Sequence, residues 1–239
     1  MRHLAELICL IACALSSYDD AIAHTPPQLR IRIVSAPSAQ ARVVIEGNLQ
    51  ESIERWSFAE EYAGVRELGK RIVSFSAIDA DGKVVDARQL TPGIYVAQRP
   101  AISFRAEIDL TPPARDTDGA HVSWLGDERA LLMLGDLVPS AYWSNRSTAA
   151  GVELSLPADW TVASAERRRA DGRFEVPNVE TALFVAGRNL RVRSERAAGM
   201  DISLAIMGHW SFTLDDALKT IADVLGEHHK LRRCAGDAR

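Results

Sequence analysis

The chain has 239 residues, of which 47% are hydrophobic and 25% charged, and its formal net charge is −4. This is ordinary globular composition, which excludes a disordered, collagen-like or coiled-coil chain. A slight acidic excess also gives no sign of a surface for nucleic acid or for an anionic membrane.

The first 23 residues have the pattern of a secretory signal peptide. A short basic start precedes an apolar stretch from Leu4 to Leu15, and Ala21-Ile22-Ala23 fits a cleavage site before His24. The stretch spans about 12 residues, against the roughly 20 that a membrane-spanning helix needs. We therefore expect a secreted or periplasmic protein with no transmembrane span.

Lipoprotein processing is the alternative for the same segment. Leu10-Ile11-Ala12-Cys13 has the order of a lipobox, which would place a lipid anchor on Cys13. With simple cleavage, Cys9 and Cys13 leave with the leader and Cys234 remains alone. The mature chain then has no intramolecular disulfide and no cysteine-based metal site.

Most of the remaining sequence alternates apolar and polar residues with a period of two, which is typical of half-buried strands. The clearest case runs from Ile102 to Leu110 and puts five apolar side chains on one face. Further strands are expected at 29–33, 43–45, 72–78, 94–96, 152–156, 174–176, 183–186, 190–192 and 200–206. Short strands separated by turns, without βα alternation, indicate a mainly β fold, either an antiparallel β-sandwich or a curved sheet.

A C-terminal helix is expected after Thr213. Thr213 can cap it, and Asp216 lies three residues later, where a carboxylate can reach back to the cap. Apolar residues then recur at helical spacing and form a candidate partner-facing stripe of Leu214, Leu218, Ile221 and Leu225. The sequence leaves open whether this stripe faces the core of its own chain or that of a partner.

The expected organisation is a signal peptide at 1–23, a β-sandwich domain at 24–210, and an amphipathic helix with a tail at 211–239. Residues 126–139 fit a helical turn or a buried strand equally well, because periodicity cannot separate the two over so short a run.

No catalytic constellation is found in the sequence. It contains no His-Glu-x-x-His, no Gly-x-Ser-x-Gly and no glycine-rich phosphate loop. His228 and His229 are adjacent, so they point about 100° apart on a helix, and a solvated helix end is favoured over a metal site. The calcium-loop-like Asp79-Ala-Asp81-Gly82 is favoured as a turn. We expect no cofactor and no metal.

Five segments carry a resemblance to a known family. They are Arg55–Ile72 (RWSFAEEYAGVRELGKRI), Ala120–Trp124 (AHVSW), Leu131–Pro139 (LLMLGDLVP), Leu156–Trp160 (LPADW) and Phe212–Asp216 (FTLDD). Together they resemble the N-terminal β domain of the glycyl aminopeptidase family, which are thermolysin-like zinc metallopeptidases that usually carry a PDZ domain. The resemblance covers residues 28–225.

The resemblance implies a non-catalytic part of a larger enzyme. In that family a helical catalytic domain carrying His-Glu-x-x-His follows the β domain, and the helix from Leu214 looks like its beginning. No catalytic residue can be carried over, and the tail from Lys230 departs from the family pattern. We therefore expect a truncated or stand-alone derivative, without peptidase activity of its own, that braces or binds a partner such as a catalytic metallopeptidase domain.

Two other functions stay open at this point. A β module of this size can bind a small ligand, a peptide or a carbohydrate through exposed aromatic residues such as Trp143. A hydrolase whose site is scattered along the sequence is the third hypothesis.

Overall fold

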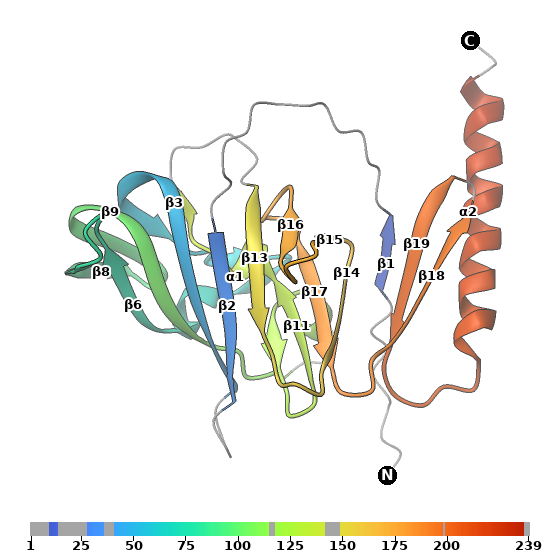
Figure 1. Cartoon of the computed structure of the whole chain (residues 1–239), viewed down its shortest axis with the longest axis horizontal. Helices are drawn as coiled ribbons and strands as arrows, with labels where there is room; N and C mark the ends of the chain where they lie inside the picture. Colours follow the sequence, from blue (N-terminus) through green and yellow to red (C-terminus); the bar gives the residue numbers. More distant parts are fainter. Residues whose placement is uncertain are drawn as a thin grey trace.

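The computed structural model describes residues 10–13, 28–35, 41–114, 118–141, 149–197 and 199–236. Strands dominate this part of the chain, and one long helix lies at its C-terminal end (Figure 1). The expected mainly β fold is therefore confirmed. None of the helices in the described ranges is both long and apolar enough to cross a membrane.

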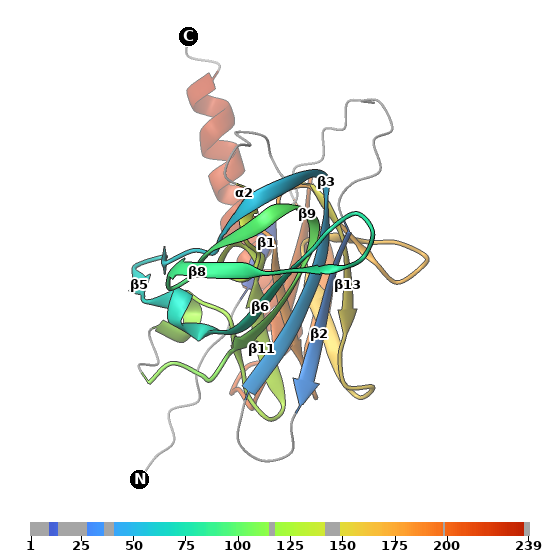
Figure 2. The ribbon, with the colours of Figure 1, turned by 90° about the vertical axis from the view of Figure 1, so that its left-hand side faces the viewer.

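The largest sheet has ten strands, and Figure 2 shows it from its outer side. Its path runs through β15 (Arg167–Arg168), β16 (Phe174–Val176), β13 (Ala150–Ser155), β2 (Gln28–Ser35), β3 (Ala41–Ser57), β9 (Ile94–Asp109), β6 (Ile72–Ile78) and β7 (Val84–Val85), while β12 (Ser140–Ala141) pairs with β3 and β8 (Ala87–Thr91) with β9. All its pairs are antiparallel except β13 with β2. The strands expected at 94–96 and 102–110 form one element, β9, whose pairing with β3 contains register shifts.

A four-stranded sheet packs on the inner face of the large one. It consists of β10 (Trp124–Leu125), β11 (Arg129–Met133), β17 (Leu183–Gly187) and β14 (Thr161–Ser164). Short elements complete this region: β4 (Glu61–Tyr62), β5 (Val65–Arg66), η1 (Leu68–Arg71), η2 (Asp118–Ala120) and α1 (Leu134–Leu137). Residues 126–139, for which the sequence allowed a buried strand or a helical turn, contain both: the strand β11 runs directly into the helical turn α1.

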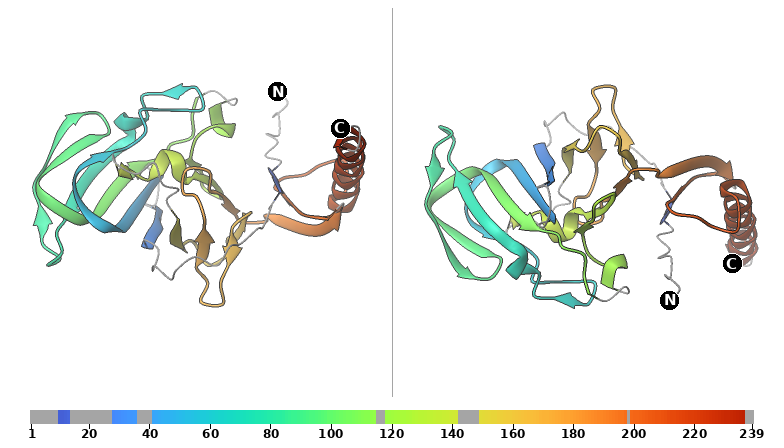
Figure 3. Two further views of the ribbon diagram at one scale, coloured as in Figure 1. Left: turned by 90° about the horizontal axis from the view of Figure 1, so that it is seen from above. Right: turned by 90° about the horizontal axis from the view of Figure 1, so that it is seen from below.

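The last part of the chain forms a hairpin covered by a helix. β18 (Arg191–Ala197) pairs with β19 (Met200–Ile206), β1 (Leu10–Cys13) pairs with the other side of β19, and α2 (Leu214–Gly236) follows. The views along the vertical axis place this hairpin between the rest of the protein and α2 (Figure 3). We call β18, β19 and α2 the hairpin–helix lobe, and the two sheets before it the sandwich.

The layers are joined by strands whose side chains point alternately into two different hydrophobic clusters. In β11, Leu132 lies in the core between the two sheets, whereas Leu131 lies in a second cluster on the outer face of the four-stranded sheet. Ala205 of β19 joins that second cluster, while Ile202 and Leu204 of the same strand pack in a third cluster beneath α2. Because side chains of a strand point alternately to its two faces, each inner layer contributes to two cores.

The β18–β19 hairpin packs on α2, the helix that follows it.

The expected domain boundary between residues 210 and 211 stays a prediction. The expected leader at residues 1–23 also stays a prediction, and the structure describes only β1 within it.

Candidate functional site

A cleft of about 1040 Å³ lies between the sandwich and the hairpin–helix lobe. It is lined by Pro112, Pro113, Gly119, Ala120, Trp124, Gly126, Asp127, Glu128, Arg129, Arg188, Asn189, Leu190, Arg191, Met207, Gly208 and His209. These residues come from four places: the chain after β9, the β10–β11 turn, the connection from β17 to β18, and the segment after β19. We call this hollow the interlobe cleft.

Trp124 is the large aromatic residue of the cleft. The residue is 5% exposed, and its Nε1 donates a hydrogen bond of 2.7 Å to the carbonyl of Gly119. The guanidinium of Arg129 lies 5.5 Å from the ring centroid, which is within range of a cation–π contact. Trp124 is therefore fixed on both sides and offers a rigid apolar surface to the cleft.

Arg188 ties two loops together at the rim of the cleft. Its guanidinium donates to Asp159 at 2.5 Å and to Glu128 at 3.0 Å, and its backbone N–H donates to the carbonyl of Glu128 at 2.8 Å. The hydrogen bond and charge of Asp159, followed by those of Glu128, raise the pKa of Arg188 above its ordinary value. These contacts connect the two loops, and the rim carries both signs of charge.

Gly187 lies where the β10–β11 turn and the Met207 side chain come close to the end of β17. A Cβ at this position would lie 2.8 Å from the carbonyl oxygen of Glu128 and 2.9 Å from the Sδ of Met207. Any larger residue would push the backbone of the β10–β11 turn away from the end of β17, whereas the Met207 side chain could move aside. Glycine at this position therefore allows the β10–β11 turn to lie close against β17 at the cleft.

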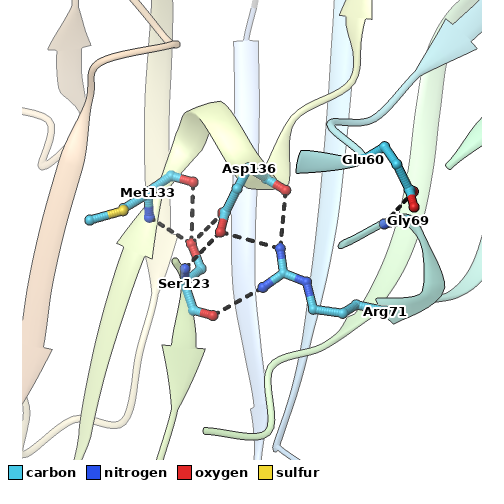
Figure 4. A network of polar contacts seen from close by, with 6 residues as sticks. All are labelled: Glu60, Gly69, Arg71, Ser123, Met133 and Asp136. Carbon is cyan, nitrogen blue, oxygen red and sulfur yellow. Dashed lines mark hydrogen bonds and ion pairs between the residues drawn. The ribbon is translucent and has the colours of Figure 1, made fainter. Parts of the chain in front are cut away.

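A polar network in the sandwich joins Arg71, Ser123, Met133 and Asp136 (Figure 4). The carboxylate of Asp136 is completely buried and accepts hydrogen bonds from the backbone N–H of Ser123 at 2.7 Å and from its hydroxyl at 2.6 Å. The same carboxylate forms an ion pair of 3.2 Å with Arg71. Arg71 also donates to the carbonyl of Ser123 at 3.1 Å, and the backbone N–H of Met133 donates to the Ser123 hydroxyl at 2.7 Å.

The residues of this network do not line the cleft but support one of its walls. It joins η1 to α1 and to the residue that precedes Trp124, so it holds the start of β10 against the large sheet. The buried charge is compensated by a cation and by two hydrogen bonds, as buried carboxylates require. Its three residues belong to the segments 55–72, 120–124 and 131–139 that carry the family resemblance.

The β4–β5 hairpin docks beside the network through Tyr62. The hydroxyl of Tyr62 donates to the carbonyl of Glu180 at 3.2 Å. Burial, followed by the negative charges of Asp136 and Glu180, raises the pKa of this phenol. Gly135 makes the contact possible, because a Cβ there would lie 2.5 Å from the Glu180 carbonyl oxygen and 2.9 Å from the Tyr62 ring. The hairpin is thus held by packing and one hydrogen bond.

The helix stripe expected to face a partner packs against its own chain. Leu218 is 2% exposed and lies in one cluster with Ile202, Leu204 and Ile206. Leu214, Ile221 and Leu225 are partly buried against the same cluster. Whether their remaining surface also contacts a partner stays a prediction.

The expected cap of this helix is present. The backbone N–H of Asp216 donates to the Thr213 hydroxyl at 3.1 Å, and the Thr213 hydroxyl donates to the Asp216 carboxylate at 2.6 Å. The calcium-like segment is a turn, as the sequence indicated: Asp79 accepts hydrogen bonds from the backbone of Asp81 at 3.0 Å and of Lys83 at 2.9 Å.

Other residues singled out from the sequence contribute less. Trp143 lies outside the described residues. His228 is exposed, and no group of three or more potential metal ligands occurs in the described ranges. The interlobe cleft and the Arg71–Ser123–Asp136 network were not predicted as features, although the segments that build the network were.

The layered antiparallel sheets, the terminal hairpin–helix lobe and the cleft define a mainly β module. The model of the Peptidase M61 N-terminal domain matches residues 61–183. The chain therefore belongs to the Peptidase M61 N-terminal domain family. No curated protein sequence matches the chain.

The solved structures that match this chain include an aminopeptidase family protein and a metallopeptidase. An aminopeptidase N family protein from Idiomarina loihiensis superposes with a TM-score of 0.67 and 14% identity, covering 83% of this chain and 36% of that one. An M1 zinc metallopeptidase from Deinococcus radiodurans gives a TM-score of 0.41 and 13% identity over 72% of this chain and 43% of that one. The chain thus spans less than half of either structure. The expected likeness to a metallopeptidase N-terminal domain is confirmed.

Proposed function

We propose that this protein is an exported, non-catalytic module that braces or binds a catalytic metallopeptidase domain and forms one wall of its substrate cleft. The observation that carries the proposal is the match of residues 61–183 to an N-terminal domain of peptidases. Those residues include the Arg71–Ser123–Asp136 network and the β10–β11 turn, which together support one side of the interlobe cleft.

The finer identity of the partner follows from the resemblance of the sequence. We propose a thermolysin-like zinc domain of the glycyl aminopeptidase type, accompanied by a PDZ domain. On this proposal the present chain supplies no zinc ligand and no acid or base. Its contribution is a rigid wall, because a cleft wall that shifts would misplace the substrate relative to the metal.

An assay of aminopeptidase activity tests the proposal in two steps. The chain from His24 onward should not hydrolyse glycyl or alanyl p-nitroanilide, with or without added zinc. Mixed with the catalytic half of a Peptidase M61 protein that lacks its own N-terminal domain, it should form a complex by size-exclusion chromatography and raise the hydrolysis rate. Hydrolysis by the chain alone, or no complex with several such catalytic halves, would refute the proposal.

A pair of charge reversals on one strand supplies a matched control. Arg191 lines the cleft and donates to the carbonyl of Gly208 at 2.9 Å, whereas Arg196, at the other end of β18, does not line it. Arg191→Glu should weaken complex formation, and Arg196→Glu should leave it unchanged. Equal effects of the two substitutions would place the contact surface elsewhere.

Export is a further part of the proposal and rests on residues 1–23. Intact-mass measurement of the protein from a periplasmic or culture fraction should give a chain that begins at His24. A membrane-bound species with an acylated Cys13 would instead support lipoprotein processing, and an unprocessed chain in the cytoplasm would contradict export.

A peptide-binding or carbohydrate-binding module is the second candidate, and the size of the interlobe cleft favours it. Its volume of about 1040 Å³ suits a small ligand, and Trp124 supplies an aromatic surface. Titration with short peptides and oligosaccharides should then change tryptophan fluorescence, and Trp124→Phe should reduce that change. A flat response in both proteins would remove this candidate.

A further inference from the structure

The two edges of the β18–β19 hairpin differ in chemistry. Four charged residues lie along β18, namely Arg191, Arg193, Glu195 and Arg196, and all are exposed. β19 carries one charged residue, Asp201, near its start, and its remaining residues are uncharged. Charged side chains on an edge strand oppose the addition of another strand, and their absence invites it. The charged edge of β18 is therefore protected from the addition of another strand, whereas the uncharged edge of β19 can pair with one.

The uncharged edge of β19 pairs with β1, a segment from the other end of the chain. β1 runs antiparallel to β19, with Leu10 opposite Ala205 and Cys13 opposite Ile202. β1 lies on the side of β19 away from β18, and Figure 1 shows the three strands in this order. The segment has the sequence Leu-Ile-Ala-Cys and carries no charge. The structure thus gives the chemistry and direction of a strand that fits this edge.

The occupant lies within the residues that the sequence predicts to be removed on export. Cleavage before His24 would take β1 away and leave the N–H and C=O groups of one side of β19 without strand partners. Unpaired backbone groups along an uncharged edge are a template for another strand. Maturation would therefore expose a binding site that the precursor covers.

We propose that the free edge of β19 is a strand-acceptor site for an uncharged, extended segment of a partner polypeptide that binds antiparallel to Ile202–Ala205. The proposal rests on the partner-binding function proposed above and names the place where the partner attaches. In the precursor, Leu10–Cys13 occupies the site, so that the partner strand binds only after the leader has been removed.

The register also defines which residues of the partner strand must be apolar. Ile202 and Leu204 are fully buried beneath α2, whereas Ala205 faces the sandwich. Residues directly opposite each other in an antiparallel pair share a face. The partner residues opposite Ile202 and Leu204 therefore extend the core beneath α2 and should be apolar, and main-chain hydrogen bonds supply the remaining affinity.

Hydrogen exchange with a model strand tests the proposal. The probe is a synthetic peptide, Leu-Ile-Ala-Ser flanked by lysines, in which serine stands for the cysteine of β1. In the chain from His24 onward, amides of β19 that face the free edge should exchange rapidly, and saturating probe should slow them at least about tenfold. Amides on the outer edge of β18 should not change, and a probe with N-methylated amides should have no effect.

The full chain, produced without export, provides the competition experiment. A tethered segment has an effective concentration of the order of 1 mM, so a probe with a Kd of about 0.1 mM should bind about tenfold more weakly to the full chain. Ile11→Pro together with Ala12→Pro should restore tight binding. Successive strand residues point their N–H groups to opposite sides, so one of these two prolines removes a donor toward β19. Ile11→Val with Ala12→Ser is the matched control and should behave as the unchanged chain.

Three results would overturn the proposal. The first is rapid exchange of the β19 edge in the full chain, and the second is probe binding that leaves β19 unprotected. The third is a concentration-dependent dimer of the mature chain with a protected β19 edge, because the occupant would then be a second copy. Probe binding without any complex with a Peptidase M61 catalytic half would leave the strand site standing and refute the proposed partner.

Discussion

The sandwich and the hairpin–helix lobe use the same alternating strand pattern, but they differ in what holds them together. The sandwich encloses the largest core, including Trp56, Phe104 and Phe184, and also holds the ion pair between the buried Asp136 and the partly buried Arg71. Among the residues whose burial the structure describes, the core of the hairpin–helix lobe has four buried side chains: Ile202, Leu204, Ile206 and Leu218. A core as small as this is marginally stable by itself.

This difference indicates which part of the protein depends on an additional strand for its stability. Layers in the sandwich are covered on their inner faces by the chain itself, whereas the outer edge of β19 in the hairpin–helix lobe is covered only by the short strand β1 in the described part of the chain. Perturbations in the sandwich should therefore unfold the whole protein, and perturbations in the hairpin–helix lobe should release only that lobe.

The largest expected effect comes from Asp136→Ala. Removing the carboxylate leaves the Arg71 cation and the Ser123 N–H without their buried partner, which costs about 3–5 kcal/mol of unfolding free energy. Urea unfolding monitored by circular dichroism measures the loss. Asp201→Ala, which removes a carboxylate from an exposed ion pair with Arg196, is the control and should leave the midpoint unchanged. Replacing both partners of the ion pair, as in Arg71→Met with Asp136→Leu, should recover part of the stability.

The second effect is local to the hairpin–helix lobe. Leu218→Ala removes a side chain that is 2% exposed from the cluster beneath α2 and should cost about 2–5 kcal/mol. Because that core is small, amides of α2 and β19 should exchange faster while those of β3 and β9 keep their protection. Val224→Ala changes a residue of the same helix that is 63% exposed and should have no comparable effect. Global loss of protection in Leu218→Ala would show that the two regions unfold together.

The sequence predicted these regions unequally. Phe104, Ala106 and Ile108 are buried on one face of β9, as the period-two pattern required, and Thr213 caps α2 as its spacing with Asp216 indicated. Such features depend on neighbours within a few residues. The Arg71–Asp136 pair joins residues 65 apart, and Ser123 lies 52 from Arg71. Nothing local distinguishes these polar side chains from surface residues, so the network needed the fold.

The third effect concerns the start of α2. Thr213→Ala removes the hydroxyl that accepts the Asp216 N–H and should lower the stability of the helix by about 1 kcal/mol. Hydrogen exchange of the first turn of α2 should accelerate by about fivefold, which is the ratio that corresponds to 1 kcal/mol. Thr213→Ser keeps the hydroxyl and should retain most of the protection. If both variants behave alike, the cap does not stabilise the helix.

The smallest effect is the pH dependence of the same cap. The hydroxyl and backbone N–H of Thr213 donate to Asp216 at 2.6 and 3.3 Å, and these bonds hold the pKa of its carboxyl below the ordinary value. A carboxyl whose pKa is lower in the folded state stabilises that state above its unfolded pKa, and this stabilisation is lost as the pH falls through the folded pKa. Protection of the first turn of α2 should therefore decline only below about pH 4. In Thr213→Ala the Asp216 resonance should titrate at a higher pH, because the hydroxyl that favours the charged form has been removed. An unchanged NMR titration in that variant would show that the helix N-terminus, and not Thr213, sets the pKa of Asp216.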